Sequence, residues 1–166
     1  MAASCFAQFL KITELTQQEI EQLKGHCYRG YVVTDDGHFL YHGKDGSDYG
    51  KVTLTLRGVK YGFRRHQLSL YLKMLDEGKD VRSEWSDGRE ASHLCHKRRC
   101  FNPGHIVLED HGINQARETC AKDRKCRGHG ESPACMFWLS PRFLWAIKGL
   151  TDRLLIALIM LIMLGQ

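Results

Sequence analysis

Residues Ser92–Cys135 read SHLCHKRRCFNPGHIVLEDHGINQARETCAKDRKCRGHGESPAC, and the rest of the chain is organised around them. It holds five of the seven cysteines and five of the nine histidines of the 166-residue chain. Its second half carries a complete set of four Cys and His side chains, the ligands that Zn²⁺ binds in tetrahedral structural sites. The four residues are Cys120, Cys126, His129 and Cys135.

The first half of the stretch supplies three further zinc ligands and needs a fourth from elsewhere. The three are Cys95, Cys100 and His105. Cys27 is the expected fourth ligand, because Cys5 is the only other cysteine left over; Cys5 and His26 remain alternatives. We therefore predict two structural Zn²⁺ ions per chain, which would order loops that have little apolar core of their own.

Two residues of this stretch, His93 and Asn114, have no role in a zinc module. With the residues around them, they resemble the His-Cys box homing endonucleases, a zinc-stabilised branch of the ββα-metal (HNH-like) nucleases. The strong resemblance covers about a quarter of the chain. It rests on Ala91-Ser92-His93-Leu94-Cys95-His96, Cys100-x-Asn102-Pro103-x-His105-Ile106 and Asn114-x2-Arg117, with weaker similarity at His26-Cys27-Tyr28 and Lys60-Tyr61-x-Phe63-Arg64-Arg65.

The resemblance implies a Mg²⁺-dependent, site-specific DNA endonuclease of the homing type. His93 would be the general base, because a neutral imidazole can take a proton from water at physiological pH. Asn114 would offer a neutral oxygen to one catalytic Mg²⁺ or another divalent cation. Lys60 stands where similar enzymes carry an arginine that helps to neutralise the scissile phosphate, and it keeps the charge without the bidentate guanidinium.

The resemblance also implies partners: double-stranded DNA, a second copy of the chain in a homodimer that makes a double-strand break, and a place in the nucleus. Residues 57–99 hold eleven Lys/Arg against six Asp/Glu, so the whole net charge of +5 could sit there. Such a basic surface favours phosphate partners, although ordinary solubility explains the same charge. Candidate DNA contacts are Arg64, Arg65, Lys73 and Arg117.

A second function fits much of the same sequence. A catalytically silent, zinc-dependent DNA-binding or regulatory protein would use the same zinc sites and the same basic surface. Such a protein has no reason to keep His93 and Asn114, and this pair favours the enzyme.

The predicted fold class is α+β, with small antiparallel β-sheets and a ββα-metal motif held by the two zinc sites. The capping box Thr16-Gln17-Gln18-Glu19 predicts a short helix over 13–24 that stops at Gly25. Residues 30–57 predict a β-meander, in which 51–56 alternate apolar and polar side chains. Residues 60–75 fit a strand or a helix, and Gly78 beyond them favours the helix.

The remaining elements follow the metal ligands. Residues 78–91 read as a loop, with Trp85 as a local packing anchor. His93 should lie on a strand, and residues 106–108 form a short apolar strand. Glu109 or Asp110 then starts a helix that carries Asn114 and Arg117 on one face.

The domain organisation predicted is one endonuclease domain, 1–140, with its zinc and catalytic core at 91–135, followed by an apolar tail, 141–166. Seven cysteines without a secretory signal indicate reduced thiols that bind metal. The uninterrupted apolar run 154–164 is shorter than the roughly 17–25 residues that cross a bilayer. We favour a dimerisation helix for this tail over a membrane anchor.

Overall fold

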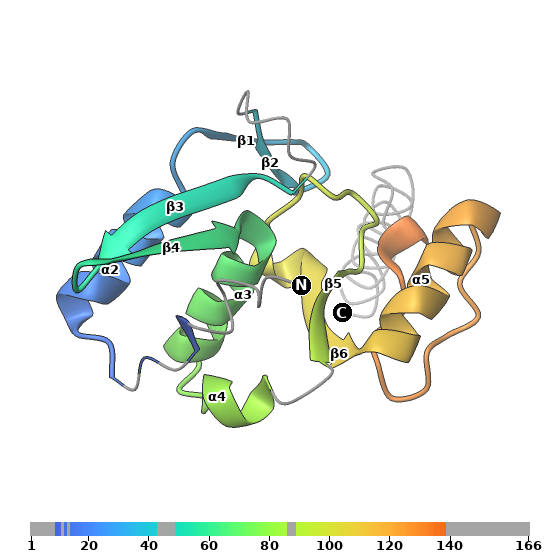
Figure 1. Ribbon diagram of the computed structural model, residues 1–166. Coiled ribbons are helices and arrows are strands. Elements are labelled where there is room, and N and C mark those ends of the chain that lie inside the picture. Colours follow the sequence, from blue (N-terminus) through green and yellow to red (C-terminus); the bar gives the residue numbers. More distant parts are fainter. Residues whose placement is uncertain (1–8, 11, 13, 43–48, 86–88, 139–166) are drawn as a thin grey trace, which may run out of the picture. The chain divides into compact units, whose positions relative to one another are not determined.

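The computed structural model describes residues 9–10, 12, 14–42, 49–85 and 89–138 (Figure 1). The chain forms two compact units, residues 1–136 and residues 137–166. The predicted tail at 141–166 and the candidate ligand Cys5 both lie outside the described residues. None of the helices in the described ranges combines the length and the apolarity that a bilayer crossing requires.

The first unit combines helices with small antiparallel sheets, which confirms the predicted α+β class. Its strands form three two-stranded sheets within the described residues, each made of neighbours in sequence. The strands are β1 (Tyr31–Val33), β2 (Phe39–Tyr41), β3 (Lys51–Leu56), β4 (Val59–Arg64), β5 (Arg89–His93) and β6 (Ile106–Asp110). The helices are α2 (Gln17–Cys27), α3 (Arg65–Asp76), α4 (Val81–Glu84) and α5 (His111–Asp123), with a 3₁₀ turn at Pro103–His105. A second 3₁₀ turn, Met136–Trp138, begins at the last residue of this unit.

The main core lies between the β3–β4 hairpin and the helices α2 and α3. The predicted alternation along β3 is present, because Val52, Leu54 and Leu56 are buried while the residues between them are exposed. A two-residue turn with positive φ at Arg57 and Gly58 joins the strands, the conformation that matches the twist of a hairpin. The core is completed by Phe9, Leu23, Phe63, Leu68, Tyr71 and Leu72.

Three predictions about the N-terminal half need correction. The capping box at Thr16 is present, but the helix runs past Gly25 to Cys27. Burial of Leu23 and Cys27 outweighs the cost of about 1 kcal/mol for a glycine within a helix. The predicted meander is instead two separate hairpins. Residues 60–75, for which we favoured a helix, are divided between strand β4 and helix α3, because the turn at Gly58 pairs the first part with β3.

The predicted ββα motif is formed by β5, β6 and α5. His93 lies at the end of β5 and pairs with Ile106, and Asp110 is the N-cap of α5. Helix α3 contacts both strands of this motif, so it joins the motif to the main core (Figure 1). The segment predicted as a loop before β5 contains the short helix α4, and Trp85 packs against the core as expected.

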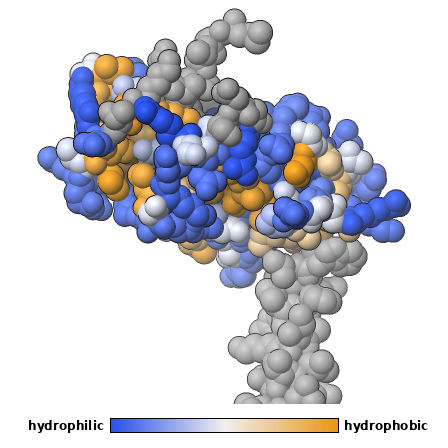
Figure 2. Space-filling view, turned by 90° about the horizontal axis from the view of Figure 1, so that it is seen from below, coloured by the Kyte–Doolittle hydropathy of each residue, from blue (hydrophilic) through white to orange (hydrophobic). Residues whose placement is uncertain are grey.

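Hydrophilic side chains dominate the face of the molecule in Figure 2, and hydrophobic residues reach it as small patches among them. Among the exposed large hydrophobic residues are Val32 and Val33 of β1 and Val59 at the start of β4. Scattered apolar residues of this kind are usual on a protein surface and indicate no particular partner.

Candidate metal centres and catalytic pocket

The second zinc cluster is assembled as predicted. The donor atoms of Cys120, Cys126, His129 and Cys135 all lie within 4.8 Å of one another. His129 Nε2 is 3.6 Å from Cys120 Sγ and 3.3 Å from Cys135 Sγ. A tetrahedral zinc site with bonds of about 2.0–2.3 Å has edges of roughly 3.3–3.8 Å, so these separations fit one shared metal ion.

The first cluster joins Cys95, Cys100 and His105 to a residue that was not predicted, His38. His105 Nδ1 lies 3.6 Å from Cys100 Sγ and 3.2 Å from His38 Nδ1, again the spacing of a tetrahedral site. A hydrogen bond from the Cys95 thiol lowers the pKa of Cys100 and favours the Cys100 thiolate that binds metal, while the same contact raises the pKa of Cys95. The four donors therefore form a second complete set suited to Zn²⁺.

The turn before β2 orients the His38 ring so that Nδ1 faces the first cluster. Asp36 Oδ2 lies 3.1 Å from His38 Nε2, so the carboxylate accepts the Nε2 proton and leaves Nδ1 to face the cluster. Asp36 in turn accepts from Lys97 Nζ at 2.8 Å and from Thr34 Oγ1 at 2.5 Å. Hydrogen bonds from Lys97 and Thr34 keep the pKa of Asp36 well below its usual value. A carboxylate behind a histidine is the usual support of a zinc ligand.

The predicted fourth ligand is thereby corrected from Cys27 to His38. Cys27 is fully buried at the end of α2, where its sulfur faces the Arg65 carbonyl at 3.9 Å. Burial raises the pKa of this thiol to about 12, so it stays protonated and packs as an apolar group. The alternative His26 lines a separate cavity with Arg29 and Tyr41, and is not part of the cluster either.

Zinc content distinguishes these two assignments. We expect Cys27→Ala to retain two Zn²⁺ per chain, whereas His38→Ala should fall to one when free zinc is limiting, because a three-ligand site holds the metal weakly. Bound zinc would be counted by elemental analysis after gel filtration, with Cys95→Ala as the control for a lost first site. A one-zinc Cys27→Ala protein with an intact His38→Ala stoichiometry would reverse the assignment.

A cavity of about 300 Å³ lies beside the ββα motif. Two of the three predicted catalytic residues, His93 and Asn114, line it, and Lys60 does not. The other lining residues are Tyr49, His96, Arg98, Arg117, Glu118, Ala121 and Lys122. The structure therefore brings the proposed base and the proposed metal ligand to one pocket, whose lining includes basic side chains.

The surroundings of His93 fix its tautomer and favour its neutral form. Its Nε2 lies 2.8 Å from the Cys100 carbonyl oxygen, which can only accept, so Nε2 donates and Nδ1 carries the lone pair. The rings of His66 and Tyr49 lie 4.7 and 5.9 Å from the His93 ring. Burial lowers the pKa of His93 below its ordinary value and keeps the imidazole neutral.

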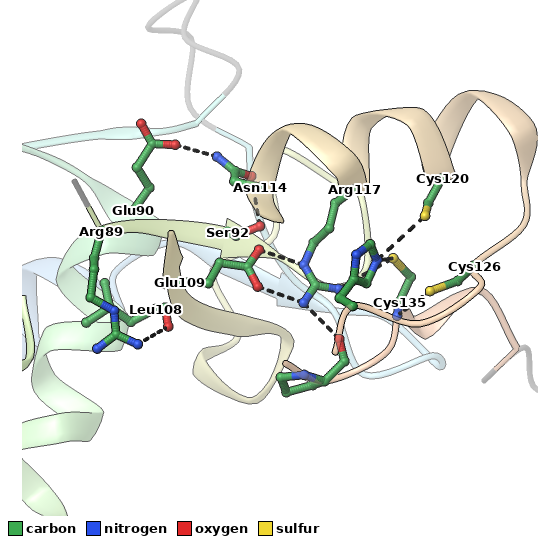
Figure 3. Close-up of polar contacts among 12 residues, drawn as sticks. Arg89, Glu90, Ser92, Leu108, Glu109, Asn114, Arg117, Cys120, Cys126 and Cys135 are labelled. Atoms are coloured by element: carbon green, nitrogen blue, oxygen red, sulfur yellow. Dashed lines mark hydrogen bonds and ion pairs between the residues drawn. The ribbon is translucent and has the colours of Figure 1, made fainter. Parts of the chain in front are cut away.

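Hydrogen bonds fix the side chain of Asn114, which also lines the pocket. Its Oδ1 accepts from Ser92 Oγ at 2.8 Å, and its Nδ2 donates to Glu90 Oε2 at 2.6 Å (Figure 3). Glu90 also bonds His111 Nδ1 at 3.1 Å. Although desolvation opposes it, hydrogen bonds from Asn114 and His111 lower the pKa of Glu90. Asn114 Oδ1 keeps a second lone pair, which fits a hard divalent cation.

Arg117, a predicted DNA contact, is instead buried inside the protein and joins neighbouring elements. Its side chain is buried, and its guanidinium binds both carboxylate oxygens of buried Glu109 at 2.6 and 2.7 Å (Figure 3). It also donates to the Pro133 carbonyl at 2.8 Å and to Cys135 Sγ at 3.5 Å. Arg117 therefore ties helix α5 to β6 and to the second candidate zinc cluster.

Arg65, another predicted DNA contact, is also buried. Its guanidinium lies over the Tyr41 ring at 4.1 Å and donates to the carbonyl oxygens of Cys27 and Arg29 at the C-terminal end of α2. A cation there offsets the partial negative charge of the helix end. The structure thus assigns Arg65 to the packing of α2 against α3.

The other basic candidates lie on the surface. Arg64 is exposed at the end of β4 and lies over the ring of Tyr49, a pocket residue, at 5.0 Å. Lys60 is on the same face of β4, four residues earlier and therefore about 13 Å along the strand. Lys73 forms an ion pair with Glu77 at 3.8 Å near the end of α3. Neither Lys60 nor Lys73 lines the pocket, and their proposed roles stay predictions.

Three residues of these sites were missed by the sequence reasoning. His38 stood within the predicted β-meander of residues 30–57, although the incomplete first ligand set was a signal to consider every histidine. Tyr49 and Glu90 carried no sequence signal, because a tyrosine in a loop and a glutamate in a strand have no motif. Their positions follow from the fold alone.

The geometry agrees with the comparison of this chain with known families. Residues 23–137 match the family model of the zinc-binding loop region of homing endonuclease. No curated protein matches the chain in a direct sequence comparison. The matched region is more than two thirds of the chain, begins before the His38 turn and ends just after Cys135, so it contains both metal clusters and the pocket. The chain therefore belongs to the homing endonuclease family of the His-Cys box type.

Proposed function

We propose that this member of a nuclease family is an active, Mg²⁺-dependent DNA endonuclease. The observation that carries the proposal is the pocket shared by His93 and Asn114. A zinc-dependent binding protein has no need for a neutral, carbonyl-oriented histidine beside an oriented carboxamide. The two together are what hydrolysis of a phosphodiester requires, a base for water and a ligand for a cation.

In this proposal His93 removes the proton of the attacking water at Nδ1. The Cys100 carbonyl holds the opposite nitrogen, so the ring needs no rearrangement and the positive charge it gains is stabilised by the same hydrogen bond. The low pKa of His93 keeps the base free before the reaction. The water attacks the phosphorus in line with the departing 3′ oxygen.

Asn114 Oδ1 would hold the Mg²⁺, with phosphate oxygens and water as its further ligands. Bound there, the ion supplies Lewis-acid stabilisation of the charge on the phosphate and on the departing 3′ oxygen. The protein contributes the orientation of the oxygen through Ser92 and the exclusion of part of the solvent by the cavity walls. Arg98 and Lys122 at the pocket would attract the DNA backbone.

The exposed face of β3 and β4 is the proposed DNA surface. Lys51, Thr53 and Thr55 of β3 stand opposite Arg64, Gly62 and Lys60 of β4, and this face ends at Arg64 beside the pocket. A two-stranded ribbon of this kind fits the major groove. We further propose a homodimer acting in the nucleus, in which two such pockets cut both strands of a duplex.

Plasmid nicking and linearisation test the proposed function. The purified two-zinc protein is incubated at low salt with several plasmid DNAs, with and without Mg²⁺; strong chelators are avoided because they would also remove the structural zinc. Mg²⁺-dependent linearisation supports the endonuclease. DNA binding without cutting of any substrate would instead establish the silent binding protein.

A further inference from the structure

We propose that Glu90 is a positioning residue, which fixes the orientation of the Asn114 carboxamide so that its oxygen serves the pocket. This inference rests on the proposed function for its catalytic consequence, but its structural part stands on hydrogen bonds alone. Glu90 lies on β5 and Asn114 on the first turns of α5, and the two side chains meet across the ββα motif (Figure 3).

A primary amide presents an oxygen and an NH₂ group of almost equal size, and its two orientations differ only in their hydrogen bonds. Ser92 cannot choose between them, because a hydroxyl can donate or accept. Glu90 can choose, because an ionised carboxylate only accepts. The contact of 2.6 Å between Glu90 Oε2 and Asn114 Nδ2 therefore places the NH₂ group on the Glu90 side.

The orientation set by Glu90 places the Asn114 oxygen on the side of Ser92. With the NH₂ group held by Glu90, Asn114 Oδ1 faces the Ser92 hydroxyl at 2.8 Å and keeps one lone pair for a cation. The reversed amide would present N–H donors instead and would repel a cation. The second oxygen of Glu90 is engaged by His111 on the same helix as Asn114, so two contacts hold the carboxylate in place.

The direct test is the side-chain NH₂ signal of Asn114 in ¹H–¹⁵N NMR of the full-length zinc-loaded protein, assigned by its loss in Asn114→Ala. We expect an unusual downfield proton in the wild type, because one N–H donates a short bond to a carboxylate. Glu90→Gln should return that signal towards ordinary values, because glutamine can offer either amide group. Glu77→Gln, an exposed charge-matched control, should leave the signal unchanged.

Cleavage provides the second measurement. Glu90→Gln is expected to lower the rate by about 10–100-fold and to raise the Mg²⁺ concentration needed for half-maximal cutting, as the loss of a ligand-orienting group does. A charge-conserving swap, Glu90→Gln with Asn114→Asp, should cut faster than Asn114→Asp alone. The single variant places two carboxylates face to face, whereas the swap leaves one carboxylate that accepts from the introduced glutamine amide. A merely structural role predicts no change in the Mg²⁺ requirement.

The outcomes separate this inference from the proposed function. An Asn114 signal that moves no more in Glu90→Gln than in Glu77→Gln overturns the positioning role, whatever the nuclease does. A wild-type protein that does not cut DNA contradicts the proposed function, and the Asn114 NMR signal then still tests the positioning role of Glu90. Normal cleavage and Mg²⁺ dependence in Glu90→Gln would overturn the catalytic consequence.

Discussion

Replacing His93 with alanine is expected to lower Mg²⁺-dependent DNA cleavage by about 10²–10⁴-fold, the usual contribution of a general base. The loss follows from chemistry rather than folding. His93 donates to the Cys100 carbonyl but belongs to neither metal cluster, so both zinc sites should stay filled. The rate would be measured by plasmid linearisation with the variant at a confirmed content of two zinc ions per chain.

An exposed histidine outside the pocket serves as the matched control. His42→Ala removes an imidazole that lies on the surface, and its cleavage rate should equal that of the wild type. Equal cleavage by His93→Ala and the wild type would mean a contaminating nuclease or a different base. His96, which lines the same pocket, would then be the next residue to replace.

The Arg117→Met variant is expected to lose about 3–5 kcal/mol of unfolding free energy, because it leaves the buried carboxylate of Glu109 without a partner. Methionine retains much of the aliphatic volume, so the loss reports the missing charge and hydrogen bonds. Urea unfolding would be followed by circular dichroism at a fixed concentration of free zinc, since metal binding contributes to stability.

Two comparisons make this prediction specific. The double variant Arg117→Met with Glu109→Leu removes both charges and should regain a large part of the loss, because no unpaired ion stays buried. Arg57→Met breaks an ion pair with Glu19 in which the arginine is 51% exposed, and it should cost at most about 1 kcal/mol. An Arg117→Met variant as stable as Arg57→Met would contradict the structural role.

The α+β fold class and part of the candidate site could be predicted from the sequence, whereas the division of the chain into individual elements could not. Candidate metal ligands and candidate catalytic residues follow chemistry and spacing, which are visible in a single chain. The second cluster is assembled as expected, and His93 and Asn114 line one pocket. The hairpin at Gly58 shows the opposite case. Residues 60–75 fit both periodicities, and only pairing with β3 divides them into strand and helix.

Long-range contacts explain the remaining errors. Arg65 and Arg117 look like surface cations in sequence, because their partners are distant along the chain: the carbonyl oxygens of Cys27 and Arg29 for Arg65, and a glutamate on another element for Arg117. Either His38 or Cys27 could be the fourth ligand beside Cys95, Cys100 and His105, and sequence spacing does not distinguish the two. The tertiary fold decides, since it buries the thiol and turns the histidine towards the cluster.

The three hairpins also bear on how the protein matures. Each sheet pairs strands that are neighbours in sequence, and such hairpins form in about 1–10 μs. The first metal cluster instead joins His38 to His105, 67 residues apart, and closing a segment of that length costs roughly 4 kcal/mol of chain entropy. Packing of the apolar core and binding of the metal ion together offset this entropy cost. We therefore expect zinc binding, rather than strand pairing, to limit the rate at which a newly made chain forms the pocket of His93 and Asn114.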